Sequence, residues 1–140
     1  MPIDGGNPIR IWERYGRGQI SPDGKWVLIL ELMSTNAKPS IIAATGGQPV
    51  KTFDRDPELG VLLGWAADSR TLLYAKASSG VSNIWQRSLD GGEAKQLTNF
   101  NSDQFPQIGD VVMSRDGKKL AVARYSSTSD VVMIKDLNAR

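Results

Sequence analysis

The sequence predicts an all-β fold made of about three four-stranded antiparallel β-propeller blades. The first observation is a turn of one form that recurs at residues 21–25 (SPDGK), 66–70 (AADSR) and 114–118 (SRDGK). Within this turn, Asp68 follows Asp23 by 45 residues, and Asp116 follows Asp68 by 48 residues. A repeat of that length is typical of one four-stranded propeller blade.

A second recurring turn supports the same period. Three times a glycine pair precedes a short segment, and glycine suits such tight reversals because it adopts positive φ without a Cβ clash. The pairs and segments are Gly5-Gly6 before 9–12, Gly46-Gly47 before 51–53, and Gly91-Gly92 before 94–97. Because the two turn types recur in phase, each repeat is expected to form one blade.

In each blade, the aspartate turn is expected to connect the first strand to a long second strand. The glycine pair is expected to precede the last strand. Residues 26–30 (WVLIL) are apolar at every position, which is typical of a strand covered on both faces. In the second aspartate turn Ser69 replaces the glycine, and the left-handed conformation costs serine more than glycine. The expected strands are 19–20, 26–32, 40–44 and 51–53; then 61–65, 71–76, 83–88 and 94–97; and finally 110–113, 119–124 and 130–136.

These strands are expected to form a single partial propeller domain, residues 1–140, with blades at about 17–53, 61–97 and 109–137. Segment 9–12 aligns with the fourth strands but lacks its first three partners, and the third blade lacks a fourth strand. Propellers usually have about four to eight blades, so three blades are not expected to close a ring. The chain is therefore expected to be a piece of a longer protein, or one half of a six-bladed homodimer in which each copy supplies the strand that the other lacks.

The composition excludes several kinds of site. The chain contains no cysteine and no histidine, which excludes disulfides, thiolate nucleophiles, Cys/His zinc sites and histidine triads. Its 17 basic and 15 acidic residues are interleaved, which argues against nucleic-acid binding. The longest apolar run is too short to cross a membrane, and no signal peptide is expected. Neither a metal nor a cofactor is expected.

The recurring turns and residues 96–98 (QLT) resemble the TolB-like, WD-like propeller repeats of bacteria. The resemblance extends from Asp4 to Asp136 and implies a propeller fold; Met113 departs from it, since the repeat has tryptophan there, as at Trp65. Residues 96–100, 102–104 and 129–136 are most similar to the C-terminal propellers of bacterial receptor-like serine/threonine kinases. That similarity implies a sensing or binding role and, within a longer protein, a periplasmic or extracytoplasmic location. The kinase motifs themselves are absent from the sequence.

Two groups of acidic residues invite different interpretations. Each turn aspartate (Asp23, Asp68 and Asp116) is expected to accept backbone N–H bonds within its own turn. Calcium requires several converging oxygen ligands, and each turn offers about one. The only dense acidic group, Asp54, Asp56 and Glu58, could instead serve acid/base catalysis, as in propeller glycosidases.

A contact surface is expected at the rim of the central channel, because propellers usually bind through loops held on the rigid blades. A protein or a small ligand is the expected partner. The residues expected to form this surface lie in connections between strands: Arg14, Tyr15, Arg17, Arg55, Asp103, Gln104 and Tyr125.

The first functional hypothesis is a non-catalytic module for protein or ligand binding, either part of a larger sensor or a self-associating half-propeller. The second is a propeller hydrolase or lyase that uses the loop carboxylates. The third is the gating propeller of a prolyl-oligopeptidase-like peptidase; the Gly-x-Ser-x-Gly nucleophile turn of such hydrolases is absent from this sequence.

Overall fold

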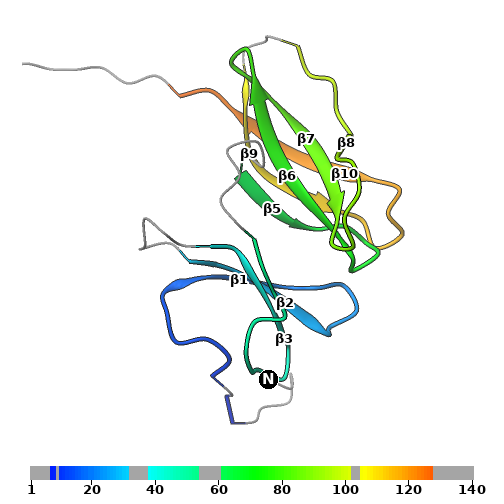
Figure 1. The fold of residues 1–140 in the computed structure, drawn as a ribbon. Coiled ribbons are helices and arrows are strands. Elements are labelled where there is room, and N and C mark those ends of the chain that lie inside the picture. Colours follow the sequence, from blue (N-terminus) through cyan, green and yellow to red (C-terminus); the bar gives the residue numbers. More distant parts are fainter. Residues whose placement is uncertain (1–6, 9, 32–37, 54–60, 102–104, 128–140) are drawn as a thin grey trace, which may run out of the picture.

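The structure is a computed structural model, which describes residues 7–8, 10–31, 38–53, 61–101 and 105–127. Within these ranges, ten strands form three antiparallel sheets, here called blades 1, 2 and 3 (Figure 1). This confirms the predicted all-β fold of four-stranded antiparallel sheets. Several predicted features lie outside the described residues: Gly5-Gly6, Leu32, Asp54, Asp56, Glu58 and strand 130–136.

Blade 1 contains strands β1 to β4, which pair in chain order. Their bounds are Gly16–Ile20, Trp26–Glu31, Ser40–Ala43 and Lys51–Thr52. In this register Val27 pairs with Ile42, and Leu28 with Ile41. Because side chains alternate between the two faces of a strand, Val27 and Leu28 lie on opposite faces of the blade.

Blade 2 repeats this order with strands β5 to β8. Their bounds are Val61–Trp65, Thr71–Ser78, Val81–Ser88 and Lys95–Gln96. The long β6–β7 hairpin reverses at Ser79 and Gly80, which both have positive φ. The reversal thus lies between the predicted strands 71–76 and 83–88.

Blade 3 is described by two strands, β9 (Gln107–Met113) and β10 (Leu120–Tyr125). They pair antiparallel, with an irregularity between Ala123 and Arg124. β9 begins three residues earlier than predicted. The expected third strand, 130–136, lies outside the described residues.

The N-terminal segment corrects one prediction. Residues 10–12 were expected to belong to a strand, but the structure shows no strand there. A strand needs a hydrogen-bonding partner, and these residues form no backbone hydrogen bond with the rest of the described chain. Ile11 and Trp12 instead pack against Val27, Ile29 and Ile42, on the face of blade 1 that points away from blade 2.

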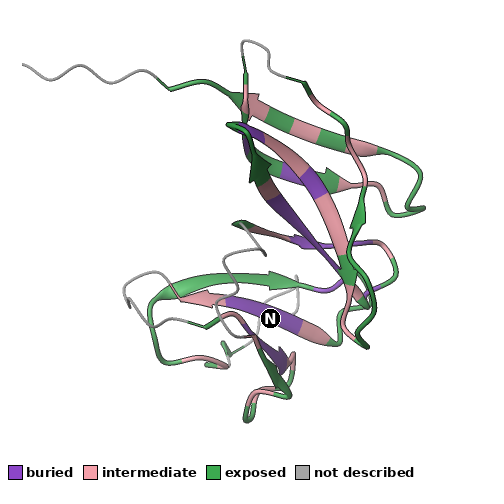
Figure 2. Ribbon diagram, turned by 45° about the horizontal axis from the view of Figure 1, so that its top comes forward, coloured by how far each residue is buried: buried purple, intermediate pink, exposed green. Residues whose placement is uncertain are grey.

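Buried residues lie within the strands of the blades (Figure 2). Apolar side chains among them pack between neighbouring blades. Leu28 and Ile41 of blade 1 pack against Trp65 and Leu72 of blade 2. On the opposite face of blade 2, a second cluster reaches blade 3. Its buried members are Ala66, Leu73, Ala75, Ile84, Ile108 and Val111. The second strands of blades 1 and 2 are thus covered on both faces, as residues 26–30 predicted.

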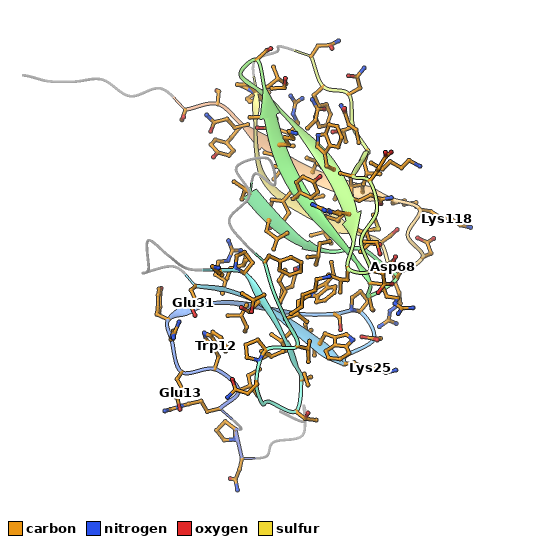
Figure 3. All side chains as sticks on the ribbon, viewed as in Figure 1. Trp12, Glu13, Lys25, Glu31, Asp68 and Lys118 are labelled. Carbon is orange, nitrogen blue, oxygen red and sulfur yellow. The ribbon has the colours of Figure 1, made fainter. Side chains whose placement is uncertain are left out.

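The aspartate turns of the three blades lie along one side of the molecule, where Figure 3 labels Lys25, Asp68 and Lys118. The Asp23 N–H donates to Ser69 Oγ at 2.9 Å, which joins the turns of blades 1 and 2. Trp65 Nε1 donates to the Gln19 carbonyl at 3.0 Å and joins the same two blades. The buried Ser69, which replaces a glycine of the repeat, has a φ of 56°.

Within the described ranges, the structure contains no helix whose length and apolar character would let it cross a bilayer.

Candidate binding surfaces

The turn aspartates have the structural role that the sequence predicts. Asp23 Oδ1 accepts hydrogen bonds from Ser21 Oγ at 2.6 Å and from the Lys25 N–H at 3.1 Å. Asp116 is bound in the same way by Ser114 Oγ at 2.6 Å and the Lys118 N–H at 3.0 Å. Each hydroxyl bond, with the backbone bond beside it, lowers the pKa of the aspartate below its ordinary value.

Asp68 accepts its hydroxyl hydrogen bond from a different residue, because Ala66 lies at the position where the other turns have serine. Thr71 Oγ1 donates to Asp68 Oδ2 at 2.6 Å, and the Arg70 N–H donates to Oδ1 at 2.9 Å. Burial raises the pKa of Asp68, but these hydrogen bonds outweigh burial and the pKa is lowered overall. Among the described residues, no three acidic side chains converge on a possible metal site.

The predicted rim residues fall on separate parts of the structure. Arg14 and Tyr15 precede β1, Arg17 lies within β1, and Tyr125 ends β10 in blade 3. The side chains of Tyr15 and Tyr125 are exposed. Arg14 forms an ion pair with Glu31. Arg55, Asp103 and Gln104 lie outside the described residues, so the rim as a whole stays a prediction.

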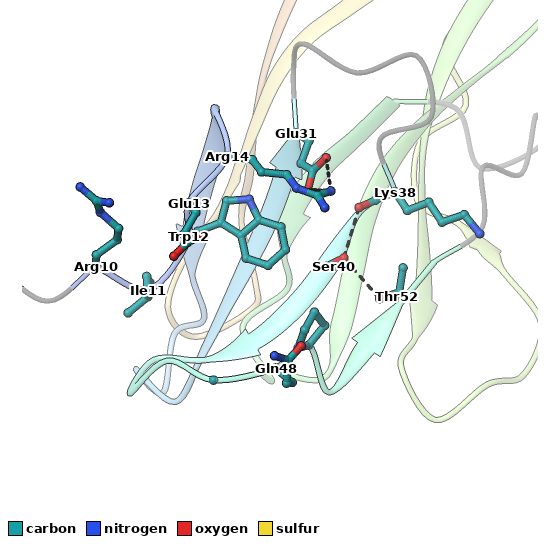
Figure 4. Close-up of a pocket in the computed structure, with 12 residues that line it drawn as sticks. Arg10, Ile11, Trp12, Glu13, Arg14, Glu31, Lys38, Ser40, Gln48 and Thr52 are labelled. Atoms are coloured by element: carbon teal, nitrogen blue, oxygen red, sulfur yellow. Dashed lines mark hydrogen bonds and ion pairs between the residues drawn. The ribbon is translucent and has the colours of Figure 1, made fainter.

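A pocket of about 730 Å³ lies on the face of blade 1 that points away from blade 2 (Figure 4). Residues 10–14 form one wall, and none of its described lining residues belongs to β1. The rest of the lining consists of Glu31, Lys38, Ser40, residues 47–49 and Thr52. Figure 4 shows the Trp12 ring among these side chains, between the Arg14–Glu31 pair and Ser40.

Some polar groups of this pocket have hydrogen-bond partners among the described residues, and one has none. The guanidinium of Arg14 contacts both oxygens of Glu31, at 3.1 and 3.3 Å, and the Glu31 side chain is only 6% exposed. Ser40 Oγ donates to the Lys38 carbonyl at 3.2 Å. The indole nitrogen of Trp12 is buried and has no hydrogen-bond partner among the described residues. A buried N–H without an acceptor is uncommon, because its desolvation is not compensated.

Sequence reasoning named Arg14 but missed Trp12 and Glu31 as parts of a site. The sequence predicted Trp12 only as part of segment 9–12, and Glu31 only as part of strand 26–32. The signal that could have found Glu31 is its register position, since it continues the alternation of Val27 and Ile29 on the same face.

The outward face of blade 3 is the second candidate surface. Val112 is 64% exposed there and pairs with Ala121, and the ring of Tyr125 lies against Gly109. The spacing of the aspartate turns aligns Ala121 with Leu73 of blade 2 and Leu28 of blade 1. Those two leucines are each 1% exposed, because the next blade covers them. In blade 3, the face that is buried in blades 1 and 2 is therefore exposed.

Solved structures with a similar fold include two TolB proteins. The chain is 21% identical to a TolB from Agrobacterium tumefaciens, with a TM-score of 0.52 over 74% of this chain and 35% of that one. It is 23% identical to TolB from Acinetobacter baumannii, with a TM-score of 0.57 over 81% of this chain and 27% of that one. It thus spans about a third of their length. No protein-family model and no curated protein matches the sequence. At these identities the comparisons show the fold alone, a TolB-like β-propeller.

Proposed function

We propose that this chain is a non-catalytic protein-binding module of the propeller type, and that the outward face of blade 3 binds blade 1 of a second copy. The observation that carries the proposal is that Ala121 is exposed at the repeat position where Leu28 and Leu73 are buried, and that its cross-strand partner Val112 is exposed beside it. This face also carries Asp110, opposite Ala123, but its remaining residues named here are apolar and favour cover by another sheet.

The two interfaces inside the chain supply the geometry of this contact. In each, the Leu28-type face of one blade packs on the face of the next blade that carries Trp65 or Met113. A second copy offers blade 1, whose β1 is exposed along its whole length. Ile11 and Trp12 already cover the outer part of that face, where the fourth strand of a preceding blade would pack. Two copies would then form a closed ring with two-fold symmetry.

Fewer observations support the other functional hypotheses. A role within a larger sensor, such as a receptor-kinase propeller, rests on the sequence resemblance. In a longer protein another blade of the same chain would cover the face of blade 3. The hydrolase and the peptidase hypotheses depend on residues outside the described part of the chain or on a separate domain. The short span of the chain relative to the TolB structures is compatible with each of these.

Light scattering coupled to size exclusion tests the proposal. The expected species has twice the 15.3 kDa mass of one chain and dissociates on dilution. Val112→Asp is expected to weaken the association at least about tenfold, because the interface would bury an unpaired carboxylate. Val61→Asp is the matched control, since Val61 is as exposed as Val112, at 64%, but lies at the start of β5 in blade 2. A monomer at all concentrations, or equal effects of the two variants, would contradict self-association.

A further inference from the structure

We propose that the aspartate turn of blade 3 binds an extended acidic segment of a partner protein through three cations, Arg115, Lys118 and Lys119. All three residues are exposed, and none forms an ion pair with another described residue. This turn lies at the edge of the blades, whereas the proposed contact with a second copy uses their flat faces. The site therefore does not depend on self-association.

The charge of this turn differs from that of the other two. Residues 114–119 carry three cations and one carboxylate, a net charge of +2, whereas 21–26 and 66–71 each carry one cation and one carboxylate. Guanidinium and ammonium groups bind carboxylates through charge-assisted hydrogen bonds. The turn of blade 3 therefore attracts an acidic ligand more strongly than its counterparts in blades 1 and 2.

Two of the three cations have no counterpart in the other blades. Arg115 and Lys119 align with uncharged residues there: Pro22, Ala67, Trp26 and Thr71. The hydrogen bonds inside the turn do not use these two side chains, since Asp116 accepts from Ser114 Oγ and from the Lys118 backbone N–H. Turns of the same form fold without the two charges, so the structure of the turn does not account for them.

The aspartate turn of blade 2 lies directly beside that of blade 3. A Cβ added at Gly117 would lie 3.5 Å from the Cβ of Ala67. The blade 2 turn contributes Arg70, whose exposed side chain contacts Asp90 at 3.6 Å. Because an exposed ion pair of this kind is weak, Arg70 can exchange Asp90 for a carboxylate of the ligand. The cations thus extend along the edge of two blades, which suits an elongated ligand.

The carboxylates of the two turns favour a protein segment over a nucleic acid. Asp68 and Asp116 are exposed among the cations. A nucleic-acid strand carries a charge about every 3.4 Å and would place phosphates against these carboxylates as well. An extended peptide with acidic residues at alternate positions presents its carboxylates on one side, about 7 Å apart. Such a peptide can reach the cations and avoid the carboxylates between them.

Nuclear magnetic resonance of the backbone amides of the full chain tests this site. The probe is a blocked pentapeptide with glutamate at its first, third and fifth positions and serine between; the controls are its glutamine version and a thymidine pentanucleotide. The glutamate peptide is expected to shift the amide resonances of residues 114–119 and Arg70, and to bind more weakly as salt is added. No response, or an equal response to the glutamine peptide, would overturn the acidic ligand. Equally tight binding of the oligonucleotide would overturn the protein segment.

Removal of charge from the turn tests the residues. The double variant Arg115→Gln, Lys119→Gln retains the hydrogen bonds of the turn and is expected to weaken binding of the glutamate peptide about threefold or more. The matched control is the double variant Arg17→Gln, Lys95→Gln, which removes an exposed arginine and an exposed lysine outside the aspartate turns. It is expected to leave binding unchanged. Equal effects of the two double variants would refute the site.

Discussion

The hydroxyl oxygen of Ser69 accepts a hydrogen bond of 2.9 Å from the backbone N–H of Asp23 in the neighbouring blade. Ser69 holds a φ of 56°, at a position where the other two blades have Gly24 and Gly117. Glycine adopts this conformation without a Cβ clash, but it offers no side-chain acceptor. The bond between the two turns thus accounts for serine at this position.

Substitutions at Ser69 separate the bond from the backbone conformation. Ser69→Ala loses the bond and keeps the strained φ, so we expect a loss of about 1–2 kcal/mol in the free energy of unfolding. Ser69→Gly loses the bond but relieves about 1 kcal/mol of strain, so its net change is expected to be small. Chemical denaturation measures both.

Ser79→Gly is the control for that experiment. Ser79 has a φ of 50° at the exposed tip of the β6–β7 hairpin, where its side chain makes no hydrogen bond to the described chain. The substitution is expected to stabilise the protein slightly, by up to about 1 kcal/mol. Equal stability of Ser69→Ala and the native chain would show that the bond between the turns contributes nothing.

Two glycines on the same face of β1 are expected to respond oppositely to alanine. A Cβ on Gly16 would lie 2.7 Å from the Leu30 carbonyl oxygen, which is backbone and cannot move aside. Gly16→Ala is therefore expected to cost about 1–3 kcal/mol. A Cβ on Gly18 would lie 3.5 Å from Val27 Cγ1, an ordinary contact, so Gly18→Ala is expected to be neutral or slightly stabilising. Thermal unfolding of both variants checks this, and the reverse order would contradict the register of β1.

The hydrogen bond from the Trp65 indole to the Gln19 carbonyl can be tested by comparing two Trp→Phe substitutions, which remove the same volume. Trp65→Phe removes the hydrogen bond to the Gln19 carbonyl as well as part of a buried ring, and is expected to cost about 2–3 kcal/mol. Trp26→Phe removes the same atoms from the same apolar cluster, without an indole hydrogen bond in the described chain. Its cost is expected to be smaller by about 1 kcal/mol. Equal costs in chemical denaturation would mean that the bond adds no stability.

Acid is expected to weaken the aspartate turns. The pKa values of Asp23, Asp68 and Asp116 are lowered in the folded chain, so the carboxylate form favours folding. The stability that these groups contribute is fully present above the unfolded pKa of about 3.9, and it is lost as the pH falls through the lower folded values. The unfolding temperature should therefore decline more steeply below about pH 4.

An asparagine variant isolates the turns from other acid effects. The double variant Asp23→Asn, Asp116→Asn cannot titrate at these positions, so its unfolding temperature is expected to be lower at neutral pH and to decline less below about pH 4. Asp90→Asn, on the exposed turn after β7, is the control. A decline as steep in the double variant as in the native chain would assign the acid effect to other carboxylates.

The strands could be predicted from the sequence because their signals are local. Turn residues with special backbone requirements, such as Gly24 and Gly91, mark where strands end, and the all-apolar run after Lys25 marks a strand with two covered faces. Val61–Trp65 was predicted with its exact bounds. β6 and β7 extend further than predicted because the Ser79-Gly80 turn is tight enough for pairing up to Ser78 and Val81.

The candidate surfaces could not be predicted because they depend on contacts between distant residues. Nothing near Trp12 in the sequence indicates that its ring lies beside Glu31 and Ser40. Segment 9–12 was assigned to a strand from its alignment with other blades, but alignment does not supply a hydrogen-bonding partner. The exposure of Val112 likewise depends on what covers blade 3, a property of the assembly rather than of the repeat.

The alanine at position 121 has a consequence for whatever packs on blade 3. Leu28 and Leu73 fill the space between blades with a branched side chain, whereas blade 3 has the smaller Ala121 at the same repeat position, paired with Val112. A complementary sheet must contribute the missing bulk through large residues of its own. In the proposed ring, the contact at blade 3 would then favour a partner with large side chains, and a blade with small side chains would pack poorly against it.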